Sequence, residues 1–241
     1  MTDCVMQRVL DLALYMFKRS SYTTHEAFLE NFSKLWFLAT LVTADEVNLD
    51  RNLLLPPRSP VTVITVYEDD RVGISIFVLM PGAKLPLHRH PKTYGLLKVL
   101  SGRVKIQAFN VLSPSAQKKI REEKCINKKA LLVEKLEEIY ADESSGPRII
   151  TPGNKNCHEI YSDSGPAAII EILSPLYDDL KPQASQPTLE WKFYSHTPVR
   201  VRYLPHADKH ITILHRIESP ADFYMDAAPY HGPQLIRTVG K

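Results

Sequence analysis

The amino-acid sequence predicts a mainly β protein, an antiparallel sandwich or barrel preceded by helices. From residue 61 onward, short β-branched segments recur at close spacing, separated by clusters of Pro, Gly, Ser and Asp. Before residue 50 the apolar residues are dense, in a pattern typical of helices. Only nine glycines occur in 241 residues, so their positions are informative about where turns must form.

Residues 5–46 are expected to be helical. A second helical segment begins at Thr23, because Thr23 as N-cap and Glu26 three residues later have the spacing of a capping box. Prolines at positions 56, 57 and 60 then end the helical part. We therefore expect residues 1–50 to form a helical segment packed on a barrel of residues 51–241, most simply as one structural domain.

The barrel strands follow in order along the chain. Strands are expected at residues 61–66, 73–80, 96–109, 149–151, 158–161, 167–173, 199–203 and 211–215. The charged run at 113–129 interrupts this pattern and predicts a solvated, partly helical insertion. A basic patch that binds a partner is the alternative interpretation of the same run.

Composition excludes several classes of protein. With 44% hydrophobic and 24% charged residues, the chain is globular, and a net charge of +3 does not argue for nucleic acid or a membrane surface. Three separate cysteines without a CxxC pair indicate a reducing compartment. Asp3 and Asp11 argue against a targeting peptide. We expect a cytoplasmic protein that can also be nuclear, and a monomer, since no apolar face repeats.

The triplet His88-Arg89-His90 is the most informative motif. Residues two apart on a strand point to the same face, so both imidazoles can bind one metal ion while Arg89 points away. Gly82 precedes His88 with five residues between, and Gly102 follows. This spacing resembles the first motif of the cupin superfamily, although Gly95 stands where that motif has a glutamate ligand.

A second glycine-framed histidine lies downstream. Gly146 is followed by five residues and Pro152, and then by Gly153 and His158. This resembles the second cupin motif, with a turn one residue longer than usual. The resemblance implies a single cupin barrel, that is, a double-stranded β-helix or jelly roll, in which His158 joins the other two histidines. A hydrogen-bonded core histidine is the alternative for His158 taken alone.

The composition of this site indicates its chemistry. Three histidines without a carboxylate are a neutral ligand set with open coordination positions, as in non-haem Fe(II) oxygenases. Such a site favours an anionic ligand such as a thiolate, because a metal deprotonates a thiol whose free pKa is about 8.5. O2 bound beside the sulfur is then placed to oxidise it.

Residues 81–91, 95–102 and 165–178 resemble the 2-aminoethanethiol (cysteamine) dioxygenase family, which includes the plant cysteine oxidases. The resemblance implies one Fe(II) per chain, held by His88, His90 and His158, with O2 as co-substrate. The family's members convert the thiol of cysteamine, or of an N-terminal cysteine on a protein, to a sulfinic acid. The oxidised N-terminus marks a protein for degradation, which implies oxygen sensing.

Two further roles follow from the resemblance. Glu171 stands where the family has an acidic residue, so its carboxylate is expected to pair with the substrate's ammonium group. From the sequence alone, a glutamate between Ile170 and Ile172 more often faces outward. Tyr177 matches a family tyrosine and is expected to hydrogen-bond the substrate or oxygen during catalysis; a packed aromatic is the alternative.

The sequence also departs from the family. Arg89 replaces the usual aspartate between the two histidines, and no cysteine is expected near Tyr194 that would form a Cys–Tyr crosslink. Cys157 is expected to be a buried apolar residue. A non-catalytic metal-binding cupin and a carbon-oxidising cupin dioxygenase remain as alternatives, although Gly95 argues against the second. No role is assigned to the remaining histidines: His25, His196, His206, His210, His215 and His231.

Overall fold

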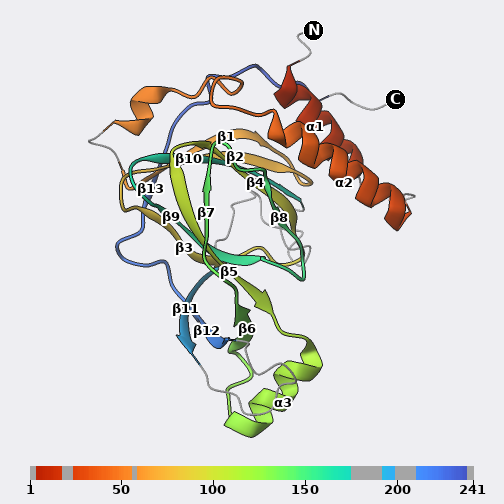
Figure 1. The fold of residues 1–241 in the computed structure, drawn as a ribbon, viewed down its shortest axis with the longest axis vertical. Coiled ribbons are helices and arrows are strands. Elements are labelled where there is room, and N and C mark those ends of the chain that lie inside the picture. The colour runs from red at the N-terminus through yellow and green to blue at the C-terminus, as the bar shows by residue number, and fades with distance from the viewer. Residues whose placement is uncertain (1–3, 18–23, 56–58, 175–191, 199–209, 238–241) are drawn as a thin grey trace.

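The computed structural model describes residues 4–17, 24–55, 59–174, 192–198 and 210–237. Two facing β-sheets form the body of the molecule, two long helices cover one sheet, and a smaller lobe extends from the other end (Figure 1). The helices of this part of the chain are α1 (Val5–Met16), α2 (His25–Thr40), the short 3-10 helix η1 (Arg51–Leu54) and α3 (Pro114–Lys124). None of them has the length and hydropathy that crossing a bilayer would require.

The first sheet has the strand order β13-β1-β2-β10-β4-β8. Its neighbours are antiparallel, except that β13 runs parallel to β1. These strands are β1 (Val61–Glu68), β2 (Gly73–Leu79), β4 (Tyr94–Ser101), β8 (Arg148–Ile150), β10 (Ala167–Ser174) and β13 (Met225–Ala227).

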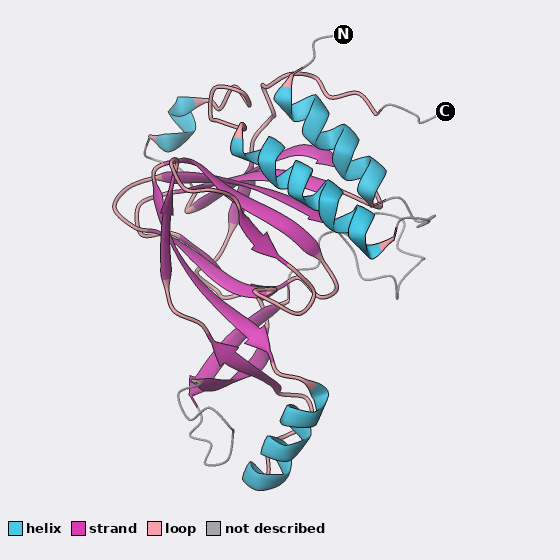
Figure 2. Cartoon of the chain, turned by 45° about the vertical axis from the view of Figure 1, so that its right-hand side comes forward, coloured by secondary structure: helices cyan, strands magenta, loops and turns pink. Residues whose placement is uncertain are grey.

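The second sheet has the order β6-β12-β11-β3-β9-β5-β7, with all pairs antiparallel. Its strands are β3 (Lys84–Arg89), β5 (Arg103–Val111), β6 (Leu131–Lys135), β7 (Ile139–Asp142), β9 (Cys157–Ser162), β11 (Phe193–Pro198) and β12 (Ile211–Ile217). The two sheets and few helices confirm the predicted mainly β, jelly-roll class (Figure 2).

Side chains alternate along β10, so the first sheet contributes residues to two hydrophobic cores, one on each face. Ile170 and Ile172 face the helices, in the core that also contains Leu10 of α1 and Leu35 of α2. Ile169 and Leu173 face the other way, into the core between the sheets, which is formed by Phe77, Leu85, Leu97, Val99, Ile106 and Ile160 among others. Because side chains alternate along a strand, Glu171 belongs to the interior face.

Three sequence-based predictions about elements need correction. The N-cap of α2 is Thr24, whose hydroxyl accepts from the amide of Ala27 at 3.2 Å; Thr23 lies outside the described residues. The segment 96–109 forms two strands, because Gly102 turns the chain with a φ of 73°. A Cβ at Gly102 would overlap the carbonyl oxygen of Pro166. Strands β6, β7, β11 and β13 were not predicted, and the expected strand 199–203 is outside the described residues.

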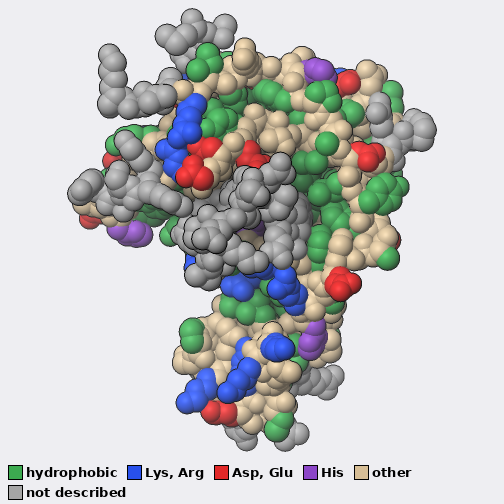
Figure 3. Space-filling model, turned by 180° about the vertical axis from the view of Figure 1, so that it is seen from behind, with side chains coloured by type: hydrophobic (Ala, Val, Ile, Leu, Met, Phe, Trp, Pro, Cys, Tyr) green, Lys and Arg blue, Asp and Glu red, His purple; other side chains and the backbone are tan. Residues whose placement is uncertain are grey.

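The smaller lobe is formed by the ends of β5 and β6, by β11 and β12, and by α3 (Figures 1 and 2). Helix α3 falls within the charged run, after the N-cap Ser113, and its Ile120 packs against Leu132 and Ile211 in a small separate core. Figure 3 shows Lys and Arg side chains spread over this lobe.

Candidate metal centre

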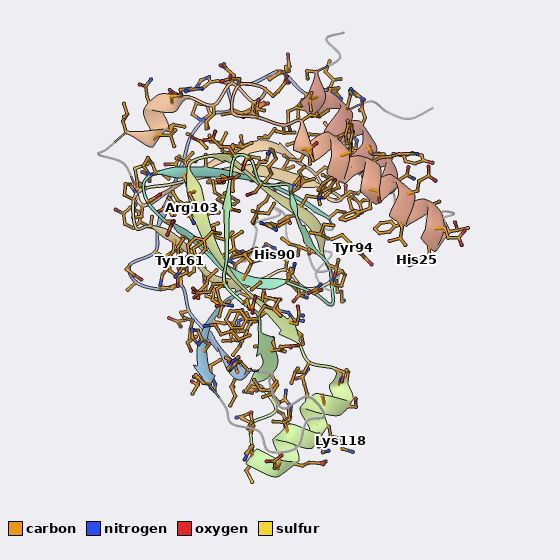
Figure 4. All side chains as sticks on the ribbon, in the orientation of Figure 1. His25, His90, Tyr94, Arg103, Lys118 and Tyr161 are labelled. Atoms are coloured by element: carbon orange, nitrogen blue, oxygen red, sulfur yellow. The ribbon has the colours of Figure 1, made fainter. Side chains whose placement is uncertain are left out.

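Three histidines converge inside the barrel from the second sheet. His88 lies on β3 and is the register partner of His158 on β9, while His90 follows the end of β3. The Nε2 atoms of His88 and His90 are 2.9 Å apart, and each of the three side chains is at most 9% exposed. Figure 4 shows His90 between the two sheets. The structure thus brings together the three histidines that the spacing selected.

Backbone carbonyls fix the orientation of two of these rings. The Nδ1 atom of His88 lies 2.8 Å from the carbonyl oxygen of Pro86, and Nδ1 of His158 lies 3.2 Å from that of Lys155. Since a carbonyl oxygen only accepts, Nδ1 is the donor in both contacts and Nε2 keeps its lone pair. A hydrogen bond from the second ring nitrogen is the usual arrangement around metal-binding histidines.

A carboxylate reaches the same place from the first sheet. Glu171 on β10 is 2% exposed, and its Oε1 atom lies 3.7 Å from Nε2 of His158. The ligand atoms of Glu171 and the three histidines all lie within 4.8 Å of one another. The outward orientation, which the sequence alone favoured for Glu171, is therefore wrong, because the period of the strand places it on the interior face.

Two of these atoms are left without a polar partner. Nε2 of His158 and Oε1 of Glu171 are buried and accept no hydrogen bond from the described residues. A buried polar atom without a partner costs free energy, and a bound cation would satisfy both. Nitrogen and oxygen donors at these separations suit a divalent transition metal. The residues of the cluster therefore fit a metal ion.

Burial keeps His88 and His90 in the neutral form that binds metal. The pKa of His88 falls well below its usual value because of burial and the nearby His158 and His90. Burial also lowers the pKa of His90 to about 4, although Glu171 opposes the effect. Burial would raise the pKa of Glu171, but His158 and His90 outweigh it and hold that pKa below the ordinary value. Neutral imidazoles and an ionised carboxylate can bind a metal without releasing protons.

A cavity of about 270 Å³ adjoins the cluster at His158. Its walls are mostly apolar, and its charged lining residues are Glu137, Arg148 and Lys155. This volume is close to the lower end of the range for small-molecule sites, so it suits a small thiol or the end of a peptide. A larger, shallow hollow between α1 and α2 is lined by Arg8, Glu30, Phe37 and neighbouring residues, none of which belongs to the cluster.

Gly95 explains why the first sheet supplies no carboxylate at the position of the cupin glutamate. A Cβ at Gly95 would lie 2.5 Å from Cδ2 of Leu173 and 3.1 Å from the carbonyl oxygen of Ile172. Leu173 is two residues beyond Glu171 on the same face of β10. The space of the missing side chain is therefore filled, and the carboxylate comes from the neighbouring strand.

Cys157 lies on the opposite face of β9 from His158. It packs with Leu87 and Phe109, and burial raises the pKa of its thiol to about 12, with Arg89 opposing the shift. Tyr194 borders the same small core. Cys157 is therefore near Tyr194 in the structure although it is distant in the sequence, because β9 and β11 both pair with β3. Both side chains lie on the face of this sheet opposite the histidines. Tyr177 lies outside the described residues.

Comparisons with known proteins agree with this geometry. The family model described as PCO_ADO matches residues 36–235. The chain is 31% identical to 2-aminoethanethiol dioxygenase of Mus musculus, over 96% of each chain. It is 32% identical to the Homo sapiens protein of that name, over 87% of this chain and 83% of the relative. Plant cysteine oxidase 2 of Arabidopsis thaliana is 25% identical, over 74% of this chain and 62% of the relative.

Proposed function

The chain belongs to the PCO_ADO family, and on this premise we propose that it is a thiol dioxygenase, which adds both atoms of O2 to a thiol sulfur and yields a sulfinic acid. The observation that carries the proposal is the buried cluster of three histidines and one glutamate, beside a small cavity with mostly apolar walls. An enzyme that oxidises sulfur needs such a dry, metal-binding site with room for a thiol.

We propose that His88, His90 and His158 hold one Fe(II) through their Nε2 atoms. The carbonyl groups of Pro86 and Lys155 support this assignment, because they hold two of the rings with Nε2 facing the cluster. When bound, the iron supplies the redox chemistry that joins the thiol sulfur to O2, the co-substrate.

The remaining polar group of the cluster has a different proposed role. Glu171 binds the ammonium group that cysteamine and an N-terminal cysteine both carry. Its buried carboxylate is ionised and lacks a hydrogen-bond partner at Oε1, so it can accept a charge-assisted hydrogen bond from the substrate. Tyr177 is proposed, from the family resemblance alone, to hydrogen-bond the substrate or oxygen.

The choice of substrate is proposed from the names of the relatives. The mammalian relatives are named for 2-aminoethanethiol and the Arabidopsis relative for cysteine. We propose that this chain oxidises cysteamine, an N-terminal cysteine of proteins, or both, and that the second reaction makes it an oxygen sensor. A monomeric enzyme in the cytoplasm and nucleus is consistent with this role.

Oxygen uptake by the iron-loaded protein tests the proposal. Cysteamine and a peptide that begins with cysteine are supplied separately, and the products are identified by mass spectrometry. We expect a gain of two oxygen atoms on the sulfur of at least one thiol. A protein that binds iron but produces no sulfinic acid from either thiol would be a non-catalytic metal-binding module, and the proposed function would be wrong.

A further inference from the structure

Three residues form a row across the interior face of the first sheet. Glu171 on β10 is the register partner of Leu97 on β4, and Leu97 is the partner of Arg148 on β8. Adjacent strands are about 4.8 Å apart, so the backbones of Glu171 and Arg148 are separated by about 10 Å. Register partners on neighbouring strands share a face of the sheet, so Glu171 and Arg148 flank Leu97 on the interior face.

Arg148 has no polar partner in the part of the chain that the structure describes. Its Nε atom is buried without a hydrogen bond, and it forms no ion pair with Glu137, the acidic residue that lines the same cavity. An arginine carries five N–H donors and stays charged at any relevant pH. A buried N–H without an acceptor costs free energy, so a ligand that supplies the acceptor would bind more tightly.

The backbone at Arg148 is held by strand pairing on one side and by a hydrogen bond to the residue before it. Strand β8 pairs with β4 through Gly95, Leu96 and Leu97. Just before it, the indole Nε1 of Trp36 on α2 donates to the carbonyl oxygen of Pro147 at 2.8 Å. This position makes Arg148 a fixed part of the cavity wall, in the same cavity as His158.

Two kinds of thiol substrate differ in the polar groups that they would bring to this cavity. Cysteamine has a thiol and an ammonium group but no oxygen. Cysteine and an N-terminal cysteine residue carry, on the carbon that bears the ammonium group, a carboxylate or a peptide carbonyl. A substrate with its sulfur at the histidines and its ammonium group at Glu171 would present this oxygen on the side from which Arg148 enters the cavity.

We propose that Arg148 is a specificity-determining residue, whose guanidinium group binds the carboxylate or carbonyl oxygen of a cysteine-type substrate. This proposal rests on the proposed thiol dioxygenase function and adds the part of the substrate that the enzyme selects. Both oxygens have the same acceptor chemistry. A carboxylate gains more from the guanidinium because its hydrogen bonds are charge-assisted on both sides.

The test compares Arg148→Met with the wild type on three thiols: cysteamine, L-cysteine, and a peptide with N-terminal cysteine and an amidated C-terminus. We expect KM to rise about 10- to 100-fold for L-cysteine and the peptide, and to change less than about twofold for cysteamine, with kcat little affected. Arg148→Lys should recover part of the loss. Comparing the losses for L-cysteine and the amidated peptide separates a carboxylate from a carbonyl.

Binding provides a readout that does not depend on turnover. The same thiols are titrated into the metal-loaded protein under nitrogen by calorimetry, and the losses of affinity should follow the KM values. Arg103→Met is the matched control, because Arg103 is half exposed and pairs with Asp163 on the barrel surface. Iron content and melting temperature establish that each variant is folded.

The outcomes separate this proposal from the one on which it rests. If the wild type oxidises none of the thiols, the proposed function fails, while the binding data still decide the role of Arg148. If the wild type oxidises a thiol but Arg148→Met binds all three substrates as the wild type does, or weakens all three equally, the proposed specificity role is wrong and the dioxygenase function stands.

Discussion

The Nε2 atoms of His88 and His90 face each other at 2.9 Å, with the two rings nearly perpendicular at 84°. Two nitrogens bound to one ion at about 2.1 Å and at right angles would be about 3 Å apart. The ring of His158 approaches that of His88 to 4.6 Å between centroids. The chain therefore arranges these donors by its own packing and hydrogen bonds, and a metal ion needs little rearrangement to bind.

Replacing His158 by alanine should remove the metal. His158 is the ligand that strand β9 adds to the His88–His90 pair at the end of β3, and three protein ligands are the minimum for a facial site. We expect an affinity loss of more than about 100-fold, measured as iron per chain after dialysis against a weak chelator. His215→Ala is the control, because His215 is exposed on β12. Full iron occupancy in His158→Ala would exclude it as a ligand.

Replacing Glu171 by glutamine separates two roles for this carboxylate. If it binds the substrate's ammonium group, the variant keeps its iron and its KM for cysteamine rises about 10-fold or more, because a charged hydrogen bond is lost. Glu159→Gln is a matched control, since Glu159 follows His158 on β9 and points to the other face. Loss of iron from Glu171→Gln would instead identify Glu171 as a metal ligand.

The strand pattern made much of the fold predictable. β-branched residues and interspersed turn residues indicated β1, β2, β9, β10 and β12, and cap and spacing rules indicated two helices before them. Strands β6 and β7 were not predicted because they are short and lie next to a charged run, so that no alternation of apolar residues is visible. Their pairing partner β5 is distant in the sequence, and such non-local contacts leave no local signal.

The histidines of the site were predictable because glycines frame them at fixed spacing. The place of Arg148 was not, because β8 has only three residues and Arg148 directly follows a proline. Its position in the cavity comes from pairing with Leu97, fifty-one residues earlier in the chain. The residue pattern alone also hid the orientation of Glu171, since Ile170 and Ile172 pack on helices that only the three-dimensional structure places there. The family resemblance, by contrast, predicted that Glu171 faces the site, and the structure places it there.

Acid should destabilise the metal-free protein well above the pH at which carboxylates titrate. The pKa of His90 is lowered from 6.5 to about 4, and the pKa of His88 is lowered as well. Between pH 6.5 and pH 4 the unfolded chain therefore binds more protons than the folded chain. Stability is therefore lost as the pH falls below about 6.5. For His90 the loss reaches about 2 kcal/mol at pH 5.

Denaturant titrations of the metal-free protein at pH 7, 6 and 5 measure this loss. The pKa of Glu171 is lowered and affects only more acidic conditions, so it does not offset the histidines in this window. The His90→Asn variant should show a pH dependence smaller by about 2 kcal/mol over the same range. Equal slopes in the variant and the wild type would contradict the depressed pKa of His90.

A side chain at position 95 should conflict with Leu173. The Cβ of Gly95→Ala would lie 2.5 Å from Cδ2 of Leu173, so we expect a loss of about 1–3 kcal/mol in the free energy of unfolding. Leu173→Ala removes that contact at a cost of its own, about 2–5 kcal/mol for a buried leucine. In the double variant the alanine at 95 should cost at least about 1 kcal/mol less than in the wild type.

Gly165→Ala is the control for backbone effects, because an added Cβ at Gly165 meets no atom within 4 Å. Its free energy of unfolding should stay within about 0.5 kcal/mol of the wild type. Additive losses at positions 95 and 173 would mean that Leu173 does not restrict position 95. Coupled losses would instead show that Leu173, which lies on the same face of β10 as Glu171, restricts the side chain that position 95 on β4 can carry.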